Sequence, residues 1–164
     1  MIQQRRGLEP GHRRKFIVVI DDTPECTKAV QFAARRAEHT GGGLVLLYVI
    51  PPATFQQWKG VENIMRAEAM DDAEEALGKF ADQVRRWSAV EPEQVIGEGE
   101  TLAEVTRVIE NDEDIAVLVL AAGTGKEGPG PLVTALAGRA SGTFPVPITV
   151  VPGWLDETAI AALA

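Results

Sequence analysis

The stretch that decides the fold is FIVVIDDTPE, residues 16–25. The apolar, mostly β-branched run at 16–20 is followed at once by Asp21 and Asp22, and then by Thr23 and Pro24. A short continuous apolar run is typical of a parallel strand that is buried on both faces. Threonine is a good helix cap and proline suits the first helical position, so we expect a helix to begin at these two residues. The segment therefore predicts a strand that leads directly into a helix.

The same alternation of apolar runs and helical patterns continues along the chain. Further strands are expected at residues 44–50, 94–96, 115–121 and 146–151, and further helices at 61–87, 102–111 (capped by Thr101) and 132–141. Parallel strands joined by right-handed crossovers place helices on both faces of a sheet. The pattern predicts an α/β fold: a doubly wound, open five-stranded parallel sheet with helices on both faces and a short C-terminal extension.

A chain of 164 residues fits one compact domain, which we expect at residues 15–152. Residues 1–14 are basic and polar and are expected to form a flexible tail. The apolar spacing within residues 153–164 predicts a short docked helix that uses Trp154, Leu155, Ile160 and Leu163. Phe55 and Trp58, in a polar loop, are expected to pack as a satellite of the core.

Composition argues against several classes of function. The net charge of −8 disfavours nucleic acid and anionic lipid as partners. The longest strongly apolar run, 115–122, is too short to span a bilayer and the N-terminus has no apolar leader segment, so we expect a cytoplasmic protein. Cys26 is the single cysteine, and His12 and His39 are the only histidines. We therefore expect no metal site and no catalytic triad, and we interpret Cys26 as packed and inert.

The best candidate for a ligand site is the glycine-rich loop at residues 122–131. Its GTGKEG sequence, 123–128, matches GxGxxG after a strand, a pattern in which backbone N–H groups approach phosphate. No acidic residue follows about twenty positions later, which disfavours a Rossmann dinucleotide site, and the glycine and lysine spacing is not that of a P-loop. The alternative is a tight surface turn, in which Pro129 and Pro131 remove two N–H donors.

If the first and fourth strands are neighbours where the strand order reverses, the Asp21–Thr23 turn faces this glycine-rich loop across a crevice. An acidic pair after a first strand also occurs in response-regulator receivers, where it holds Mg²⁺ beside a phosphoacceptor aspartate. The third strand here ends in Gly97-Glu98-Gly99 and supplies no such aspartate. We therefore disfavour a phosphorelay role.

Four segments together resemble the universal stress protein family: residues 16–25, LLYVI at 46–50, VLVL at 117–120 with the following glycines, and PVPITVV at 145–151. The resemblance implies a fold of the adenine-nucleotide α-hydrolase group. It also implies a cytoplasmic stress-response protein that forms a homodimer through its last strand, here through Ile148 and Val150. It also implies that one branch of the family binds ATP or AMP without known catalysis and that another binds no nucleotide.

In the nucleotide-binding branch, an Asp that closes the first strand and a Val in the second-strand motif hold adenine, and they correspond to Asp21 and Val49. The family's phosphate motif is a Gly, two residues, a Gly, about nine residues and then Gly-Ser or Gly-Thr. Ala122 stands at the first Gly and Gly125 at the second, while the Gly-Ser pair falls on Thr134-Ala135 or, with Gly125 and Gly128 paired, on Gly138-Arg139. The candidate nucleotide-binding residues are therefore Asp21, Thr23, Val49, Ala122, Gly123, Gly125, Lys126, Gly128 and Thr134.

Loss of the glycine-hydroxyl pair predicts weak binding of ATP or AMP, since each missing charge-assisted hydrogen bond costs about 1.5–3 kcal/mol. We therefore interpret the chain as a non-catalytic stress-response binding module. Two alternatives stay open: a dimeric interaction protein that binds no nucleotide, and a weak nucleotide hydrolase. The hydrolase alternative lacks the Ser-Gly-Gly-x-Asp-Ser and His-x-Gly-His motifs of nucleotidyl chemistry.

Overall fold

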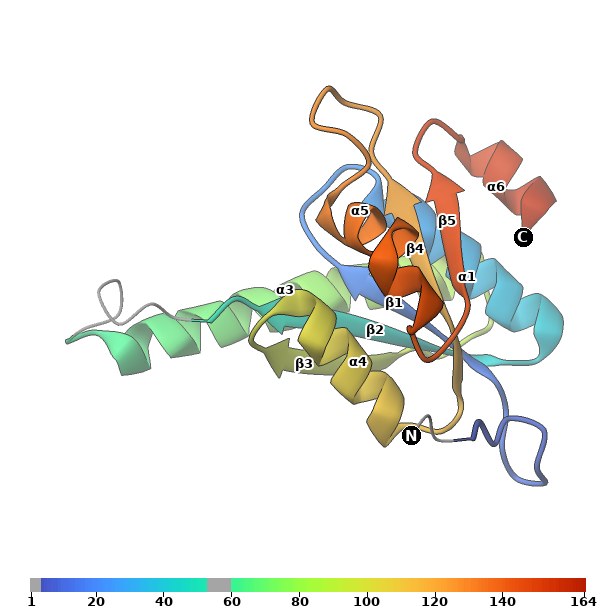
Figure 1. The fold of residues 1–164 in the computed structure, drawn as a ribbon, viewed down its shortest axis with the longest axis horizontal. Helices are drawn as coiled ribbons and strands as arrows, with labels where there is room; N and C mark the ends of the chain where they lie inside the picture. Colours follow the sequence, from blue (N-terminus) through green and yellow to red (C-terminus); the bar gives the residue numbers. More distant parts are fainter. Residues whose placement is uncertain (1–3, 53–59) are drawn as a thin grey trace.

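The computed structural model describes residues 4–52 and 60–164. Its centre is a parallel sheet of five strands in the order β3-β2-β1-β4-β5 (Figure 1). These strands are β1 (Lys15–Ile20), β2 (Gly43–Ile50), β3 (Glu93–Glu98), β4 (Ile115–Ala122) and β5 (Ile148–Pro152). The predicted α/β fold with a five-stranded parallel sheet is confirmed, and the first and fourth strands are neighbours.

Helices cover both faces of the sheet, as predicted. One face packs on α1 (Cys26–Thr40), α3 (Glu62–Trp87) and α6 (Glu157–Leu163), and the other on α4 (Thr101–Asn111) and α5 (Pro131–Ala137). Successive strand residues enter opposite cores: Val18 belongs to the first and Ile17 to the second, and both are almost fully buried. Because both faces are covered, the inner strands β1, β2 and β4 appear in the sequence as apolar runs.

The start of α1 differs from the sequence prediction. The helix begins at Cys26, after Pro24, and its N-cap residue, Glu25, makes no capping hydrogen bond with its side chain. Thr23 does not cap the helix; its backbone N–H and its hydroxyl both donate to Oδ1 of Asp21, at 2.9 and 2.5 Å. The turn after β1 is therefore organised around the Asp21 carboxylate.

Two other helix boundaries also differ. Glu100, rather than Thr101, caps α4, because its carboxylate accepts hydrogen bonds from the backbone N–H groups of Leu102 and Ala103. The helix predicted at 132–141 is divided: α5 ends at Ala137, and a short 3₁₀ helix, η1 (Arg139–Gly142), follows it. Gly138 separates the two.

The N-terminal segment, expected to be a flexible tail, is attached to the turn between α4 and β4. The Arg5 guanidinium donates to the carbonyl oxygens of Ile109 and Asp112, at 2.7 and 3.0 Å. Arg6 donates its backbone N–H to the carbonyl of Glu113, and His12 Nδ1 lies 2.7 Å from Oδ1 of Asp114. Among the described residues of this segment, basic groups therefore pair with the acidic turn at 112–114.

The C-terminal extension forms the docked helix α6. Leu155 and Ile160 are buried against α1 and the sheet, while Trp154 and Leu163 are exposed, so two of the four apolar residues expected to dock do so. Gln31, buried in α1, donates from Nε2 to the carbonyl oxygen of Glu157 at 3.0 Å. Phe55 and Trp58 lie outside the described residues. No described helix combines the length and the apolar character that crossing a membrane requires.

Cys26 is a core residue and is only 4% exposed. The Sγ atom lies 3.7 Å from the Val19 carbonyl oxygen, to which it donates, and accepts from the Asp21 backbone N–H at 3.5 Å. Burial raises the pKa of this thiol from 9.0 to about 12. Its environment therefore agrees with the interpretation of a packed, inert cysteine.

The first prediction concerns Gly153, which lies directly after β5 and beside the backbone of Ala122. A Cβ at this position would overlap the Ala122 carbonyl oxygen, so Gly153→Ala should lower the free energy of unfolding by about 1–3 kcal/mol. Gly78→Ala is the matched control, because Gly78 lies within α3 with open space around it. It should raise stability by about 0.5–1 kcal/mol in urea unfolding. Equal effects of the two substitutions would contradict a close approach of Gly153 to the Ala122 backbone.

The second prediction concerns the Cys26 thiol. Because the folded pKa lies above the unfolded one, the neutral thiol contributes stability that is fully present below pH 9.0 and is lost as pH rises toward 12. Iodoacetamide at pH 8 should therefore alkylate the folded protein far more slowly than the urea-unfolded chain, as followed by mass spectrometry. Equal rates in the two states would contradict a protected thiol. In alkaline unfolding series, wild type should lose stability relative to Cys26→Ala above pH 9.0.

Candidate functional site

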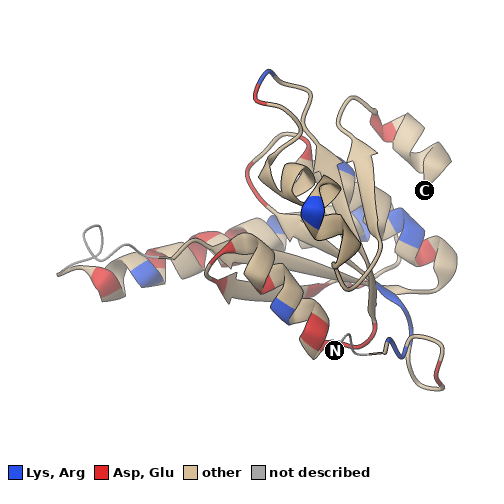
Figure 2. Cartoon of the chain, in the orientation of Figure 1, with Lys and Arg blue, Asp and Glu red and all other residues tan. Residues whose placement is uncertain are grey.

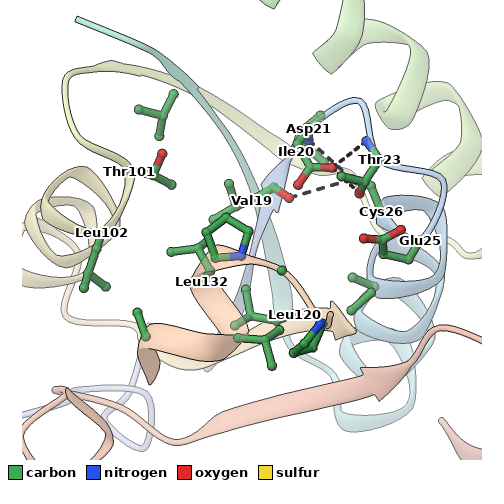
Figure 3. Close-up of a pocket in the computed structure, with 18 of the residues that line it drawn as sticks. Val19, Ile20, Asp21, Thr23, Glu25, Cys26, Thr101, Leu102, Leu120 and Leu132 are labelled. Carbon is green, nitrogen blue, oxygen red and sulfur yellow. Dashed lines mark hydrogen bonds between the residues drawn. The ribbon is translucent and has the colours of Figure 1, made fainter. Parts of the chain in front are cut away.

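The main cavity opens at the carboxyl ends of β1, β2 and β4. Its volume is about 380 Å³, within the range of small-molecule sites. We call it the inner hollow. Figure 3 shows Asp21, Thr23, Glu25 and Cys26 along one wall, with Leu120, Leu132, Thr101 and Leu102 around the other sides. Its lining is mostly apolar and includes Val19, Ile20, Ala29, Val49 and Val119. Such a lining suits a flat, largely apolar group.

A second, wider hollow of about 920 Å³ adjoins the first and lies along the glycine-rich loop. We call it the outer hollow. The two hollows share the lining residues Thr23, Glu25, Gly130, Pro131 and Ala135. The crevice at the switch point of the sheet therefore consists of two adjoining parts, one mostly apolar and one bounded by the loop.

The structure divides the sequence-predicted site residues between these two parts. Asp21, Thr23 and Val49 line the inner hollow. The outer hollow is lined again by Thr23, together with Gly123, Gly125, Gly128 and Thr134. Ala122 and Lys126 line neither hollow. Ala122 is the last residue of β4 and pairs with Pro152, so its position is fixed by the sheet.

The glycine-rich loop makes hydrogen bonds within itself. Gly123 donates its backbone N–H to the carbonyl of Pro129 at 3.0 Å, and Gly128 donates to the carbonyl of Gly125 at 3.2 Å. Pro129 and Pro131 have no N–H to offer. These internal bonds and prolines leave fewer amides to face a bound group.

Thr134, which counting along the chain aligned with the family's glycine-hydroxyl pair, lies inside α5 rather than at its first residue. The helix begins three residues earlier, at Pro131, and Gly130 is its N-cap residue. The backbone N–H of Thr134 already donates to the Gly130 carbonyl at 3.0 Å. The structure therefore presents a proline at the first helical position and no side-chain hydroxyl there.

The charged residues of the crevice are all acidic. Asp21, Glu25 and Glu100 line the inner hollow, and Glu25 and Glu127 line the outer one. None of the described lining residues of either hollow is Lys, Arg or His. Lys126 is exposed, and Figure 2 shows the basic and acidic positions of this loop at its outer tip. The crevice therefore has a negative electrostatic character.

Sequence reasoning missed Glu25 and Glu100 as lining residues. Each stands immediately before a helix, where an acidic residue is usually explained by capping or by the helix dipole. For Glu100 that explanation holds, since its carboxylate caps α4. Glu25 makes no such cap, and the sequence carried no signal that its carboxylate lies beside Gly123, far along the chain. Within the described residues, no group of three potential metal ligands is found.

Several solved structures of universal stress proteins have a similar fold. Universal stress protein UspA from Lactobacillus plantarum is 16% identical over 84% of this chain and 97% of its own, with a TM-score of 0.69. The universal stress protein from Archaeoglobus fulgidus in complex with dAMP is also 16% identical, over 92% of this chain and 99% of its own, with a TM-score of 0.60.

A third similar structure is a universal stress protein in complex with cAMP, 13% identical over 85% of this chain and 97% of its own, with a TM-score of 0.58. At these identities the three structures establish the fold. No curated protein matches the sequence. The family model described as "Universal stress protein family" matches residues 12–152, which is most of the chain. This chain is therefore a member of the universal stress protein family.

Proposed function

We propose that this protein is a non-catalytic stress-response module that binds an adenine-class ligand weakly in the crevice between β1 and β4. The observation that carries the proposal is the inner hollow, which combines a mostly apolar lining with Asp21, Thr23 and Val49. A flat base fits between apolar walls, and polar groups at the rim fix its orientation. Asp21 has one carboxylate oxygen bonded to Thr23, and we assign its other oxygen to the ligand.

Two relatives support the choice of an adenine ligand. The solved structures of universal stress proteins in complex with dAMP and with cAMP share the fold of this chain. Both ligands contain adenine and a phosphate. We transfer the adenine part to the inner hollow, and we expect AMP or ATP to bind weakly because the loop amides near the phosphate position are partly engaged.

The proposal is for binding rather than catalysis. The one cysteine at the crevice, Cys26, has a thiol pKa near 12 and is therefore a poor nucleophile at neutral pH. Asp21, which follows β1, accepts hydrogen bonds from the backbone N–H and the hydroxyl of Thr23, and this holds the turn in place. We also propose a cytoplasmic location, which the single, free and buried cysteine supports.

We further propose that the protein forms a homodimer through β5. This strand is at the edge of the sheet and pairs only with β4 among the described strands. Val150 is 42% exposed on it, and an apolar surface hollow that includes Val133, Val146 and Ile148 lies beside it. An exposed apolar edge strand needs a partner or a cover, and a second copy supplies one.

The third prediction tests the ligand site. In isothermal titration calorimetry, wild type should bind AMP and ATP with dissociation constants in the range of roughly 0.1–1 mM, and GMP more weakly. Asp21→Ala should weaken AMP binding about tenfold, because it removes a polar group of the inner hollow. Asp22→Ala is the matched control, since Asp22 is exposed and lines neither hollow. No heat from any adenine compound at millimolar concentration would overturn the proposed site.

The fourth prediction tests the dimer. Light scattering at micromolar concentration should give twice the mass of the 17.6 kDa chain. Val150→Lys should yield a monomer, because a charge at the edge strand opposes strand pairing. Val61→Lys is the matched control: Val61 is 46% exposed, like Val150 at 42%, but lies before α3. A monomeric wild type, or equal effects of the two variants, would contradict a β5 interface.

A further inference from the structure

Glu25 lies where the two hollows of the crevice meet. It is one of the residues that line both, and it directly precedes α1. Figure 3 shows its side chain on the same wall of the inner hollow as Asp21 and Thr23. A group that extends from the inner hollow toward the glycine-rich loop must pass this residue.

The Glu25 carboxylate faces the glycine-rich loop. A Cβ added to Gly123 would lie 3.0 Å from its Oε1 atom, so the carboxylate is in close approach to the loop backbone. Its side chain is half-buried and has no hydrogen bond or ion pair with any described residue. An unpaired, partly buried carboxylate attracts hydrogen-bond donors and repels anions.

The other two carboxylates of the inner hollow, Asp21 and Glu100, are engaged, which distinguishes Glu25 from them. Asp21 accepts two hydrogen bonds from Thr23, and Glu100 accepts two from the start of α4. Glu127 lines only the outer hollow and is exposed. Among the described residues, Glu25 is therefore the carboxylate at the junction that accepts no hydrogen bond from a neighbouring donor.

No cationic side chain in the described lining offsets this charge. No Lys, Arg or His lines either hollow, and the N–H groups of Gly123 and Gly128 are bonded within the loop. A phosphate placed at the junction would therefore meet a carboxylate with no cation beside it. A sugar hydroxyl at the same place would find a hydrogen-bond acceptor.

We infer that the crevice prefers an uncharged purine nucleoside such as adenosine to the corresponding nucleotides, and that Glu25 is the residue that determines this preference. The inference rests on the adenine site proposed above and specifies its ligand class. The Glu25 carboxylate accepts a hydrogen bond from a nucleoside hydroxyl and repels a phosphate that extends toward the glycine-rich loop.

The fifth prediction follows from this selectivity. In calorimetric titrations without divalent cations, wild type should bind adenosine about tenfold more tightly than AMP, since repulsion between neighbouring like charges is large enough for such a change. Glu25→Gln should strengthen AMP binding about five- to tenfold by removing that repulsion. It should change adenosine binding less than twofold, because the amide oxygen still accepts a hydrogen bond from the sugar hydroxyl. Glu74→Gln is the matched control, because it makes the same change of net charge on the exposed surface of α3.

The outcomes separate this inference from the proposed function. If neither adenosine nor AMP binds wild type, the adenine site and its selectivity are both overturned. If AMP binds wild type as tightly as adenosine, or if Glu25→Gln and Glu74→Gln behave alike, the selectivity is overturned and the site stands. A gain in ATP affinity on adding Mg²⁺ that Glu25→Gln abolishes would also overturn it, because Glu25 would then assist phosphate binding through the cation. Circular dichroism and Glu25→Ala, expected to bind AMP as Glu25→Gln does, control for folding.

Discussion

The site depends on one topological constraint: β1 is hydrogen-bonded to β2 on one edge and to β4 on the other. The chain leaves β1 into α1 on one face of the sheet and leaves β4 into α5 on the opposite face. The two connections diverge, and a crevice opens at the carboxyl ends of these strands. Burial of β1 on both faces fixes this arrangement, because its alternate residues are anchored in the two cores. The crevice is therefore a consequence of sheet order rather than of any one side chain at its rim.

What the crevice can bind is determined by how its polar groups are already used. Each backbone N–H can donate one strong hydrogen bond, so amides that hold the loop together are not equally available to a phosphate. Gly123 and Gly128 donate within the loop, and prolines occupy positions 129 and 131. Across the crevice, Asp21 uses one oxygen to organise the turn after β1. The hydrogen bonds that hold these two loops in place therefore use polar groups that a ligand would otherwise contact.

The strands could be predicted well from the sequence. Burial on two faces produces continuous apolar runs, and glycine, proline and aspartate residues mark where these runs end. Helix starts were harder to predict because capping depends on which side-chain acceptor bonds to which backbone N–H group. Asp21 binds Thr23, and the longer side chain of Glu100 reaches the amides that Thr101 was expected to satisfy.

The site was predictable in location but not in detail. Counting along the chain aligned Thr134 with the family's glycine-hydroxyl pair, and Thr134 lies inside α5, which begins at Pro131. The approach of Glu25 to Gly123 joins residues distant in sequence, so no local pattern indicated it.

The position of the basic N-terminal segment was also not predictable from the sequence. Its positive charge lies at the opposite end of the sheet from the crevice. There Lys15 begins β1 and pairs with Asp112, and Arg6 pairs with Glu113. With those cations bound to the α4–β4 turn and a net charge of −8, the electrostatic potential around the crevice adds to the local effect of Glu25 rather than opposing it. Shared topology thus places a crevice in this chain, and we propose that its own carboxylates determine the charge of the ligand it accepts.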